Sequence, residues 1–433
     1  METKKHNMFE HSRFSGRVTT AALLCTIIVA LSIPGVALGA ASVHSSARSA
    51  AMGGAFTGLA KGVNAAKYNP ANLGLEGYRQ FGLEFAALGA SVTNNSFSLA
   101  DYNTYTGATL STADKQDILN KIPIEGLSID ADVKASALSL AMGSLVLSFN
   151  GVGAADVNLN RDIVDLVLNG NTFADTLDVT GSYSDALSYA TAGLSYGTAL
   201  YSSGSRQLAV GVTASYIRGI AIEQVVSLRG LAAAYETGFE GEGEAIIRTA
   251  TGGTGYGLDV GAAFKLNDRY TAGARIENVV SRIKWDNDPQ EQGYIFQFDT
   301  ATIDDFDEDF VTSDDYSKDI PAFTTTLPAV MNVGFAHTAG KLLWAVDWTQ
   351  GFRAAPGAST KPRVAVGAEY RLLGVLPLRA GYGAGGDRAT AFSFGSGLDF
   401  LGFYLDAAVV TGSTLSIYSA KGANVALSTG IVF

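Results

Sequence analysis

Alternation of apolar and polar side chains with a period of two residues is the feature that most restricts the fold of this chain. It recurs from about Tyr78 to the C-terminus and is clearest in residues 361–373, where Val364 and Val366 fall on one face and Glu369 on the other. A period of two is the repeat of a β-strand whose faces meet different surroundings. The chain is therefore predicted to be all-β, either a soluble sandwich or a transmembrane barrel.

The connections between the alternating segments distinguish these two folds. Short turns, at 142–144, 202–206, 267–269, 338–341, 373–375 and 400–401, alternate with long polar connections, at about 94–126, 159–185, 230–242, 286–327 and 351–360. Outer-membrane barrels sort their connections in this way, with short turns on one side and long loops on the other. A sandwich has no reason to do so, and we predict a transmembrane antiparallel β-barrel.

Counting the alternating segments between these connections predicts about 14 strands over residues 78–433. An even number puts both ends of the barrel sequence on the periplasmic side, as in single-chain bacterial barrels. The expected strands are 78–93, 127–142, 143–158, 184–201, 206–229, 243–266, 269–285, 328–338, 341–352, 361–373, 375–385, 389–400, 401–412 and 421–433.

Residues 1–39 have the pattern of a secretory signal peptide. Basic residues from Lys4 to Arg17 precede an apolar run over 21–33, and small residues at Ala37 and Gly39 indicate cleavage before Ala40. Export into a bacterial outer membrane is the location that this leader and the barrel pattern predict together. No later segment approaches 18 consecutive apolar residues, so no transmembrane helix is expected.

Few residues remain that could support metal or catalytic chemistry. The only cysteine, Cys25, lies in the leader, and of four histidines only His44 and His337 lie beyond it. Beyond the leader, a thiolate nucleophile and a disulfide framework are therefore excluded. A zinc centre would have too few histidine ligands and no cysteine ligand. His337 falls on the lipid-facing parity, so the chain is predicted to be neither an enzyme nor a cofactor protein.

Charge sorts with the alternation. The formal net charge of -11 argues against a nucleic-acid partner. Placing the apolar face outward turns most strand charges into the lumen, which is expected because a lipid-facing Arg or Lys at mid-depth costs about 2–4 kcal/mol. The predicted lumen-facing residues are Glu84, Asp259, Arg275, Glu277, Arg363, Glu369, Arg371 and Arg379, together with Asp347 and Asp406.

The last strand, 421–433, places Val425, Leu427, Ile431 and Phe433 on its apolar face. This resembles the C-terminal signal by which bacterial barrels are recognised for assembly. We therefore expect Phe433 to be read by the barrel-assembly machinery, which makes that machinery a predicted partner.

The segment between leader and first strand carries a glycine-rich stretch, Met52-Gly-Gly-Ala-Phe56, and then Tyr68-Asn-Pro-Ala-Asn72. It resembles the N-terminal segment of the long-chain fatty-acid transporter (FadL-type) superfamily and of PorV-like barrels. The resemblance implies that residues 40–77 form a hatch inside a 14-stranded barrel. The residues that carry it are Gly53, Gly54, Asn69, Pro70 and Ala71.

The resemblance implies three alternative functions. The first is passive transport of hydrophobic or amphipathic small molecules, with a lipid-like ligand. The second is a PorV-like role with proteins of a secretion system, and the third is a plugged barrel that only anchors surface loops. Family likeness specifies a fold better than a cargo.

The long connections carry two further predictions. Residues 286–327 are strongly acidic, densest at Asp304–Asp309, and are expected to form a solvated external loop near lipopolysaccharide, without an EF-hand calcium site. Helix starts are predicted at Ser111, which has a capping-box spacing to Asp114, and at Arg161, with an end at Asn169-Gly170. Apolar residues of the second helix could collect a hydrophobic ligand or pack on neighbouring loops.

Overall fold

The computed structural model describes residues 43–170, 176–235, 238–301, 312–387, 390–412 and 414–433. All of them belong to one compact unit that spans 37–433. The predicted signal peptide and the acidic run Asp304–Asp309 lie outside the described residues and stay predictions.

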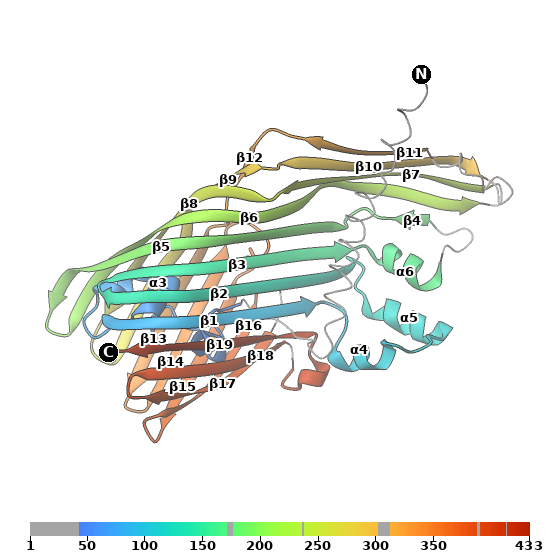
Figure 1. Cartoon of the computed structure of the whole chain (residues 1–433). Coiled ribbons are helices and arrows are strands. Elements are labelled where there is room, and N and C mark those ends of the chain that lie inside the picture. Colours follow the sequence, from blue (N-terminus) through green and yellow to red (C-terminus); the bar gives the residue numbers. More distant parts are fainter. Residues whose placement is uncertain (1–42, 171–175, 236–237, 302–311, 388–389, 413) are drawn as a thin grey trace. The chain divides into compact units, whose positions relative to one another are not determined.

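A closed antiparallel barrel of 14 strands forms the body of the described chain (Figure 1). Closure is direct, because β1 pairs with β19 from Gly82–Val432 to Thr93–Gly422. The barrel strands are β1 (Gln80–Asn94), β2 (Leu127–Gly143), β3 (Leu145–Leu159), β5 (Tyr183–Ser203), β6 (Arg206–Tyr235), β8 (Gly252–Lys265), β9 (Tyr270–Asn287), β13 (Val330–Ala339), β14 (Leu342–Gly351), β15 (Arg363–Leu372), β16 (Leu376–Gly385), β17 (Thr390–Phe400), β18 (Phe403–Gly412) and β19 (Gly422–Val432). The predicted fold class is confirmed.

The outer face of the barrel is apolar and the inner face is covered. On β15, Val364, Val366 and Tyr370 are 45%, 44% and 46% exposed, whereas Ala365 and Glu369 of the opposite parity are 3% and 2% exposed. A water-soluble domain would bury the first set, so this surface is suited to lipid. No helix among the described residues is long and apolar enough to cross a membrane.

Two predictions about the loop side of the sheet were wrong. The single strand expected at 243–266 is divided at Thr251 into β7 (Gly238–Ala250) and β8, and both pair with the 30-residue β6. The expected loop 286–327 contains β10 (Gln290–Ala301), β11 (Thr312–Asp319) and β12 (Phe323–Thr325). β10 pairs with β7 and β11 with β10, so backbone hydrogen bonds order these strands within the segment predicted to be a loop.

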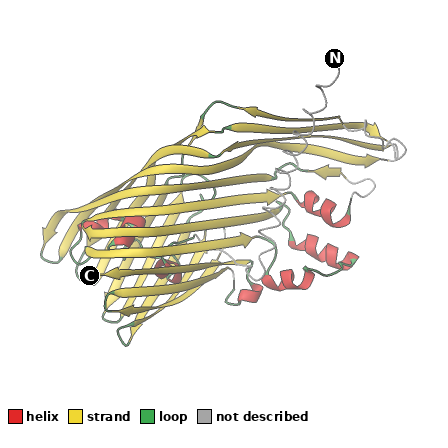
Figure 2. Ribbon diagram, viewed as in Figure 1, coloured by secondary structure: helices red, strands yellow, loops and turns green. Residues whose placement is uncertain are grey.

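Helices occupy two separate places in the fold, the lumen and one rim (Figures 1 and 2). Inside the barrel are α2 (Ala47–Ala51), α3 (Val63–Tyr68) and η1 (Pro70–Gly74), whereas α4 (Leu99–Tyr105), α5 (Thr112–Lys121), α6 (Arg161–Asn169) and η2 (Ile417–Ser419) follow the long connections, where β4 (Thr176–Asp178) also pairs with β6. We call this rim the loop end and the opposite rim, with the short hairpin turns, the turn end. The predicted helix starts are confirmed: Ser111 caps α5 in a capping box with Asp114, and α6 ends before Gly170.

Candidate functional site

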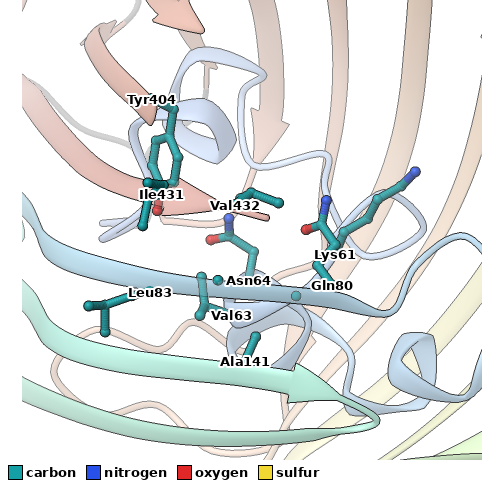
Figure 3. A pocket seen from close by; sticks show the side chains of 11 residues that line it. Lys61, Val63, Asn64, Gln80, Leu83, Ala141, Tyr404, Ile431 and Val432 are labelled. Atoms are coloured by element: carbon teal, nitrogen blue, oxygen red, sulfur yellow. The ribbon is translucent and has the colours of Figure 1, made fainter. Parts of the chain in front are cut away.

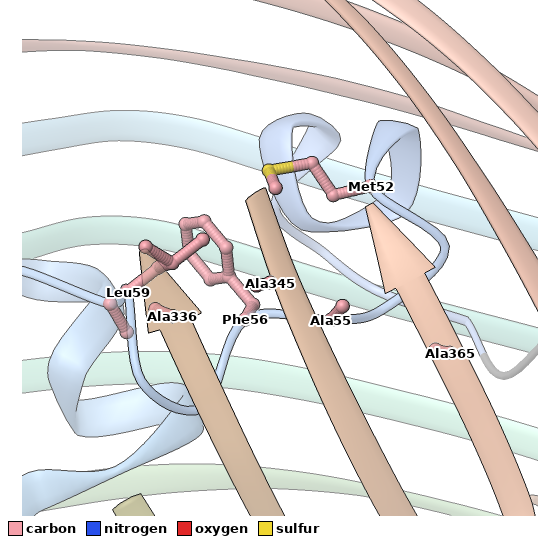
Figure 4. Close-up of a cluster of buried hydrophobic side chains, with 8 residues drawn as sticks. Met52, Ala55, Phe56, Leu59, Ala336, Ala345 and Ala365 are labelled. Carbon is pink, nitrogen blue, oxygen red and sulfur yellow. The ribbon is translucent and has the colours of Figure 1, made fainter. Parts of the chain in front are cut away.

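The N-terminal segment of the described chain, residues 43–77, lies inside the barrel, and we call it the hatch. Met52, Phe56 and Leu59 are at most 4% exposed and pack on Ala336 and Ala345 of the wall (Figure 4). Small wall residues admit these large side chains, as required by close packing. This part of the hatch is thus packed directly against the inner wall of the barrel.

The Asn-Pro-Ala motif is fixed against β6 and β8. Asn69 caps η1, because its Oδ1 accepts the N–H of Ala71 at 3.1 Å while its Nδ2 donates to the carbonyl of Ala262 at 3.0 Å. A Cβ added at Gly211 would lie 2.3 Å from the carbonyl carbon of Pro70. Glycine in the wall, as well as in the hatch, therefore allows this approach.

The Gly53-Gly54 pair turns the chain after α2. Both residues have positive φ, 69° and 91°, which favours glycine. The carbonyl of Gly53 accepts a hydrogen bond from Arg363 Nη1 at 3.0 Å, and a Cβ at Gly54 would lie 2.6 Å from His44 Nε2. Arg363 therefore faces the lumen and holds this turn.

The first charged attachment of the hatch, the Arg48 clasp, joins α2 to the wall. Arg48 donates to both oxygens of Glu369, at 2.7 and 3.0 Å. Glu369 also accepts from Arg379 at 2.7 Å, and Arg379 donates to Asp406 at 2.6 Å. Glu369 and Arg379 are 2% and 5% exposed, so their charges depend on these partners. Arg371 adds a contact to Glu369 at 3.2 Å and pairs with Asp399 at 2.7 Å.

The second attachment, the Asp347 clasp, holds the hatch backbone. Asp347 Oδ2 accepts the N–H groups of Phe56 at 3.0 Å and Thr57 at 2.8 Å, and the residue is 3% exposed. These N–H groups have no strand or helix partner of their own, so the carboxylate supplies what secondary structure would otherwise give.

The third attachment, the Lys67 clasp, ties α3 to two sides of the barrel. The Lys67 ammonium pairs with Glu84, and the backbone carbonyl of Lys67 accepts a hydrogen bond from the Arg275 guanidinium. Arg275 pairs with Asp259 at 2.6 Å and with Glu277 at 3.5 Å, so all three predicted lumen residues of β8 and β9 meet at one point. Glu84 lies at a bulge in β1, between Glu84 and Ala86.

Arg48 and Lys67 were missed as site residues by the sequence reasoning. A signal existed, because residues 43–75 contain three bases and no Asp or Glu, while the inward face of the strands is rich in acids. From this difference in charge one could have predicted that bases of the hatch pair with acids of the wall, but not which base pairs with which acid.

An apolar patch, the Trp285 cluster, lies on the lumen face toward the loop end and was also missed. Trp285 and Ile283 of β9 are fully buried and lie on the same inward parity as Arg275, farther along the strand from the hatch. The Trp285 indole N–H donates to Thr325 at 2.9 Å. The cluster consists of Ile217, Ile222, Ala250, Ile283, Trp285 and Leu327, with Leu187, Tyr189 and Phe323 packed against it.

Helices α4, α5 and α6 lie at the loop end, beside the ends of strands β1, β2 and β3 (Figure 1). Ile118 and Leu119 of α5 are buried, whereas Leu166 and Val167 of α6 are 37% and 78% exposed. A hydrogen bond from Tyr105 and the ammonium of Lys121 hold the pKa of Asp117 below its usual value, which keeps that carboxylate charged. The apolar side of α6 is only partly covered.

A hollow lies at the turn end between the hatch and the closing strands of the barrel, β1 and β19 (Figure 3). It lies between α3 and strands β1, β18 and β19, and Asn64 and Tyr404 line it. Asn64 Oδ1 and Tyr404 Oη are buried and find no hydrogen-bond partner among the described residues. The hatch is therefore packed less completely here than against β6 and β8.

One prediction concerns the Asp347 clasp. We expect Asp347→Asn to loosen the hatch around Phe56 and Thr57, because a single amide oxygen accepts more weakly and its NH2 group opposes the hatch donors. An unsatisfied buried donor costs about 1–3 kcal/mol. Hydrogen exchange should become faster at residues 53–60 while the barrel strands stay protected. Thr349→Val, on the same strand, is the control, since Thr349 contacts Asn332 and not the hatch. Equal exchange in Asp347→Asn and wild type would contradict the role of this clasp.

A closed 14-stranded barrel with an apolar exterior and its own N-terminal segment packed inside it defines the class of hatch-containing membrane β-barrels. Two family profiles match the sequence. One, described as "F plasmid transfer operon, TraF, protein", covers residues 66–300, and a family of unknown function (DUF5723) covers 223–407. The first match includes more than half of the chain, and the protein belongs to that TraF family.

Solved structures share the fold at low sequence identity. The toluene transporter TbuX of Ralstonia pickettii has a TM-score of 0.53 at 15% identity, over 90% of this chain and 98% of that one. A FadL homologue of Pseudomonas aeruginosa (TM-score 0.49, 12% identity, 92% and 99% covered) and the toluene transporter TodX of Pseudomonas putida (0.45, 13%, 89% and 96%) also align. No curated protein matches. The fold implied by the sequence resemblance is thus shared with TbuX, whereas PorV likeness stays a prediction.

Proposed function

We propose that this protein is a passive transporter of hydrophobic or amphipathic small molecules in a bacterial outer membrane. The observation that carries the proposal is the division of the lumen, with the apolar Trp285 cluster toward the loop end and the polar clasps of the hatch beyond it. The named cargo of TbuX and TodX, toluene, belongs to the same chemical class.

Capture of an apolar molecule at the Trp285 cluster follows from the hydrophobic effect. Burial of the ligand's own apolar surface contributes about 25 cal/mol per Å², so a small hydrocarbon would gain affinity without any charged partner once the side chains of the cluster, which are buried against one another, separate to admit it. Thr325 and the Arg248 guanidinium, 5.3 Å from the Phe323 ring, give a polar edge that suits amphipathic molecules. Sites of this composition, apolar with few polar groups, are typical of small-molecule binding.

Passage would then require movement of the hatch. The weakest packing lies at the hollow beside β1, β18 and β19, where Asn64 and Tyr404 lack partners among the described residues. The β1 bulge at Glu84 and the break in β2–β3 pairing between Ser136 and Leu140 lie in the same part of the wall. These irregularities support an exit route on this side.

The cellular setting belongs to the proposal. A cleaved leader over 1–39, recognition of Phe433 by the assembly machinery, and lipid and lipopolysaccharide around the barrel are what this function needs. The Phe433 N–H donates to Phe81 at 2.8 Å and the residue is 80% exposed, which is compatible with such recognition.

The fluorescence of Trp285 can report ligand binding. The chain has three tryptophans, and Trp344→Phe with Trp348→Phe leaves Trp285 alone. In lipid nanodiscs we expect toluene and a medium-chain fatty acid to change the Trp285 emission saturably, because both would enter its cluster. Ile217→Thr with Ile283→Thr should weaken binding about tenfold, since replacing buried apolar groups by hydroxyls costs at least about 1.4 kcal/mol.

Ile246→Thr is the matched control, because Ile246 belongs to β7 outside the cluster. No saturable response to either probe would contradict the proposal and favour a plugged structural barrel. Co-purification of secretion components in place of lipid-like molecules would favour the PorV-like alternative.

A further inference from the structure

Two hairpin turns at the turn end place leucine where the backbone favours other residues. Leu373 and Leu401 have φ of 52° and 51°, and each is followed by a glycine with positive φ, Gly374 at 78° and Gly402 at 85°. The first of two such positions normally holds Asn, Asp or Gly, because a larger side chain crowds the left-handed backbone. These leucines are therefore not explained by turn chemistry.

The same leucines are almost fully uncovered. Leu373 is 81% exposed and Leu401 is 86% exposed. Exposure to water would add an unfavourable apolar surface to a strained backbone. Other turns at this end have ordinary polar tips, namely Ser202–Ser205, Asn267–Arg269 and Thr338–Lys341.

The two tips continue the apolar outer face of the barrel. Leu372, Phe400 and Phe403, beside the tips and on the outward parity, are 39%, 59% and 39% exposed. The charged pair nearest the tips, Arg371 with Asp399, points to the lumen. On strands β15 to β18 no polar residue therefore separates the outer face from the tips.

Strand length supports the same conclusion. β15, β16 and β18 have 10 residues each and β17 has 11. A tilted strand needs about 9–11 residues to cross the hydrocarbon core of a bilayer. These hairpins, like β13–β14 with 10 residues in each strand, are just long enough to cross, so their tips end at the membrane boundary and the polarity of each tip decides whether it enters the bilayer. β5, with 21 residues, can extend beyond this boundary.

We propose that the β15–β16 and β17–β18 tips are immersed in the bilayer, with Leu373 and Leu401 inserted among phospholipids of the leaflet at the turn end. The inference rests on the membrane placement proposed above. The polar tips of β8–β9 and β13–β14 lie in water, so the barrel is anchored more deeply along one side than along the other.

Single-cysteine labelling tests this depth difference. In a Cys25→Ser background, Leu373→Cys and Leu401→Cys carry a polarity-sensitive fluorophore, and the protein is placed in phospholipid vesicles containing bromine-labelled acyl chains. We expect blue-shifted, lipid-quenched emission at both tips. Asn267→Cys and Ala339→Cys, on polar tips, should give aqueous emission. Emission at the tips like that of Asn267→Cys would overturn the proposal. Shielding of the tips from both lipid and aqueous quenchers would also overturn it, because it would indicate that protein covers them.

Val366→Cys, on the outer face of β15, separates this proposal from the membrane placement itself. Lipid quenching at Val366→Cys with aqueous tips would overturn only the inserted tips. Aqueous emission at Val366→Cys would overturn the membrane placement as well.

A double variant, Leu373→Asn with Leu401→Asn, gives a second readout. Asparagine tolerates positive φ, so unfolding temperature in detergent should be equal to or above wild type. In vesicles, the extra thermal stability that wild type gains from the bilayer should be reduced. Unchanged behaviour in vesicles would overturn the proposal, and so would an equal loss in detergent, because the turns themselves would then need leucine.

Discussion

A barrel lacking residues 47–74 is expected to conduct ions continuously in a planar bilayer, whereas the full chain stays closed. The lumen of a 14-stranded barrel is too wide for its own wall side chains to fill, so removal of the hatch leaves a water-filled channel. The wall should survive, because Arg379 keeps its pairs with Glu369 and Asp406 and the strand ladder does not involve the hatch. Single-channel recording measures the difference directly.

A single substitution that pushes the hatch away from the wall tests its role in closing the lumen without a deletion. Gly211→Ala would place a Cβ 2.3 Å from the carbonyl carbon of Pro70, so the Asn-Pro-Ala turn must move and brief openings should appear. Gly151→Ala is its control, because a Cβ there meets nothing within 4 Å. A hatchless barrel that remains closed would show that the loop-end segments block the lumen.

The barrel could be predicted from the sequence because its determinants are local. Alternation along residues 361–373 and the short turn predicted at 400–401, which the structure places at Leu401-Gly402, each need only neighbouring residues, and the inward parity of Glu369 follows from the same pattern. β10 and β11 escaped prediction because they lie in the run 286–327, whose many acidic residues indicated a solvated loop, and only the pairing of β10 with β7 and of β11 with β10 reveals them.

The contacts of the site could not be predicted in the same way. Arg48 and Glu369 are 321 residues apart in the sequence. No local sequence pattern predicts which acidic residue of the wall pairs with a given basic residue of the hatch. The hatch itself was indicated by family resemblance around Asn69-Pro70-Ala71, while the wall glycines opposite it, such as Gly211, look like any inward residue. Ile217 and Trp285 were detectable as apolar residues on the inward parity, an exception to the sorting of charges into the lumen.

Glu369→Gln is expected to lower the free energy of unfolding by about 3 kcal/mol, because removing one partner of a buried ion pair leaves the other charge uncompensated. Arg379, 5% exposed, would keep only Asp406, and Arg48 would lose both of its charged hydrogen bonds. Denaturant unfolding in detergent micelles measures the loss. Lys361→Gln is the control, since its pair with Asp387 is 69% and 56% exposed and contributes at most about 1 kcal/mol.

Arg48→Met separates the role of the clasp from the stability of the wall. It frees α2 from Glu369 but leaves Glu369 paired with Arg379 and Arg371, so we expect a smaller loss of stability than in Glu369→Gln. Hatch openings in single-channel recordings should nevertheless be as frequent as in Glu369→Gln, because both variants break the same attachment. If Arg48→Met stays closed while Glu369→Gln opens, the network serves the wall alone and the hatch is held by its contacts with Asp347 and Glu84.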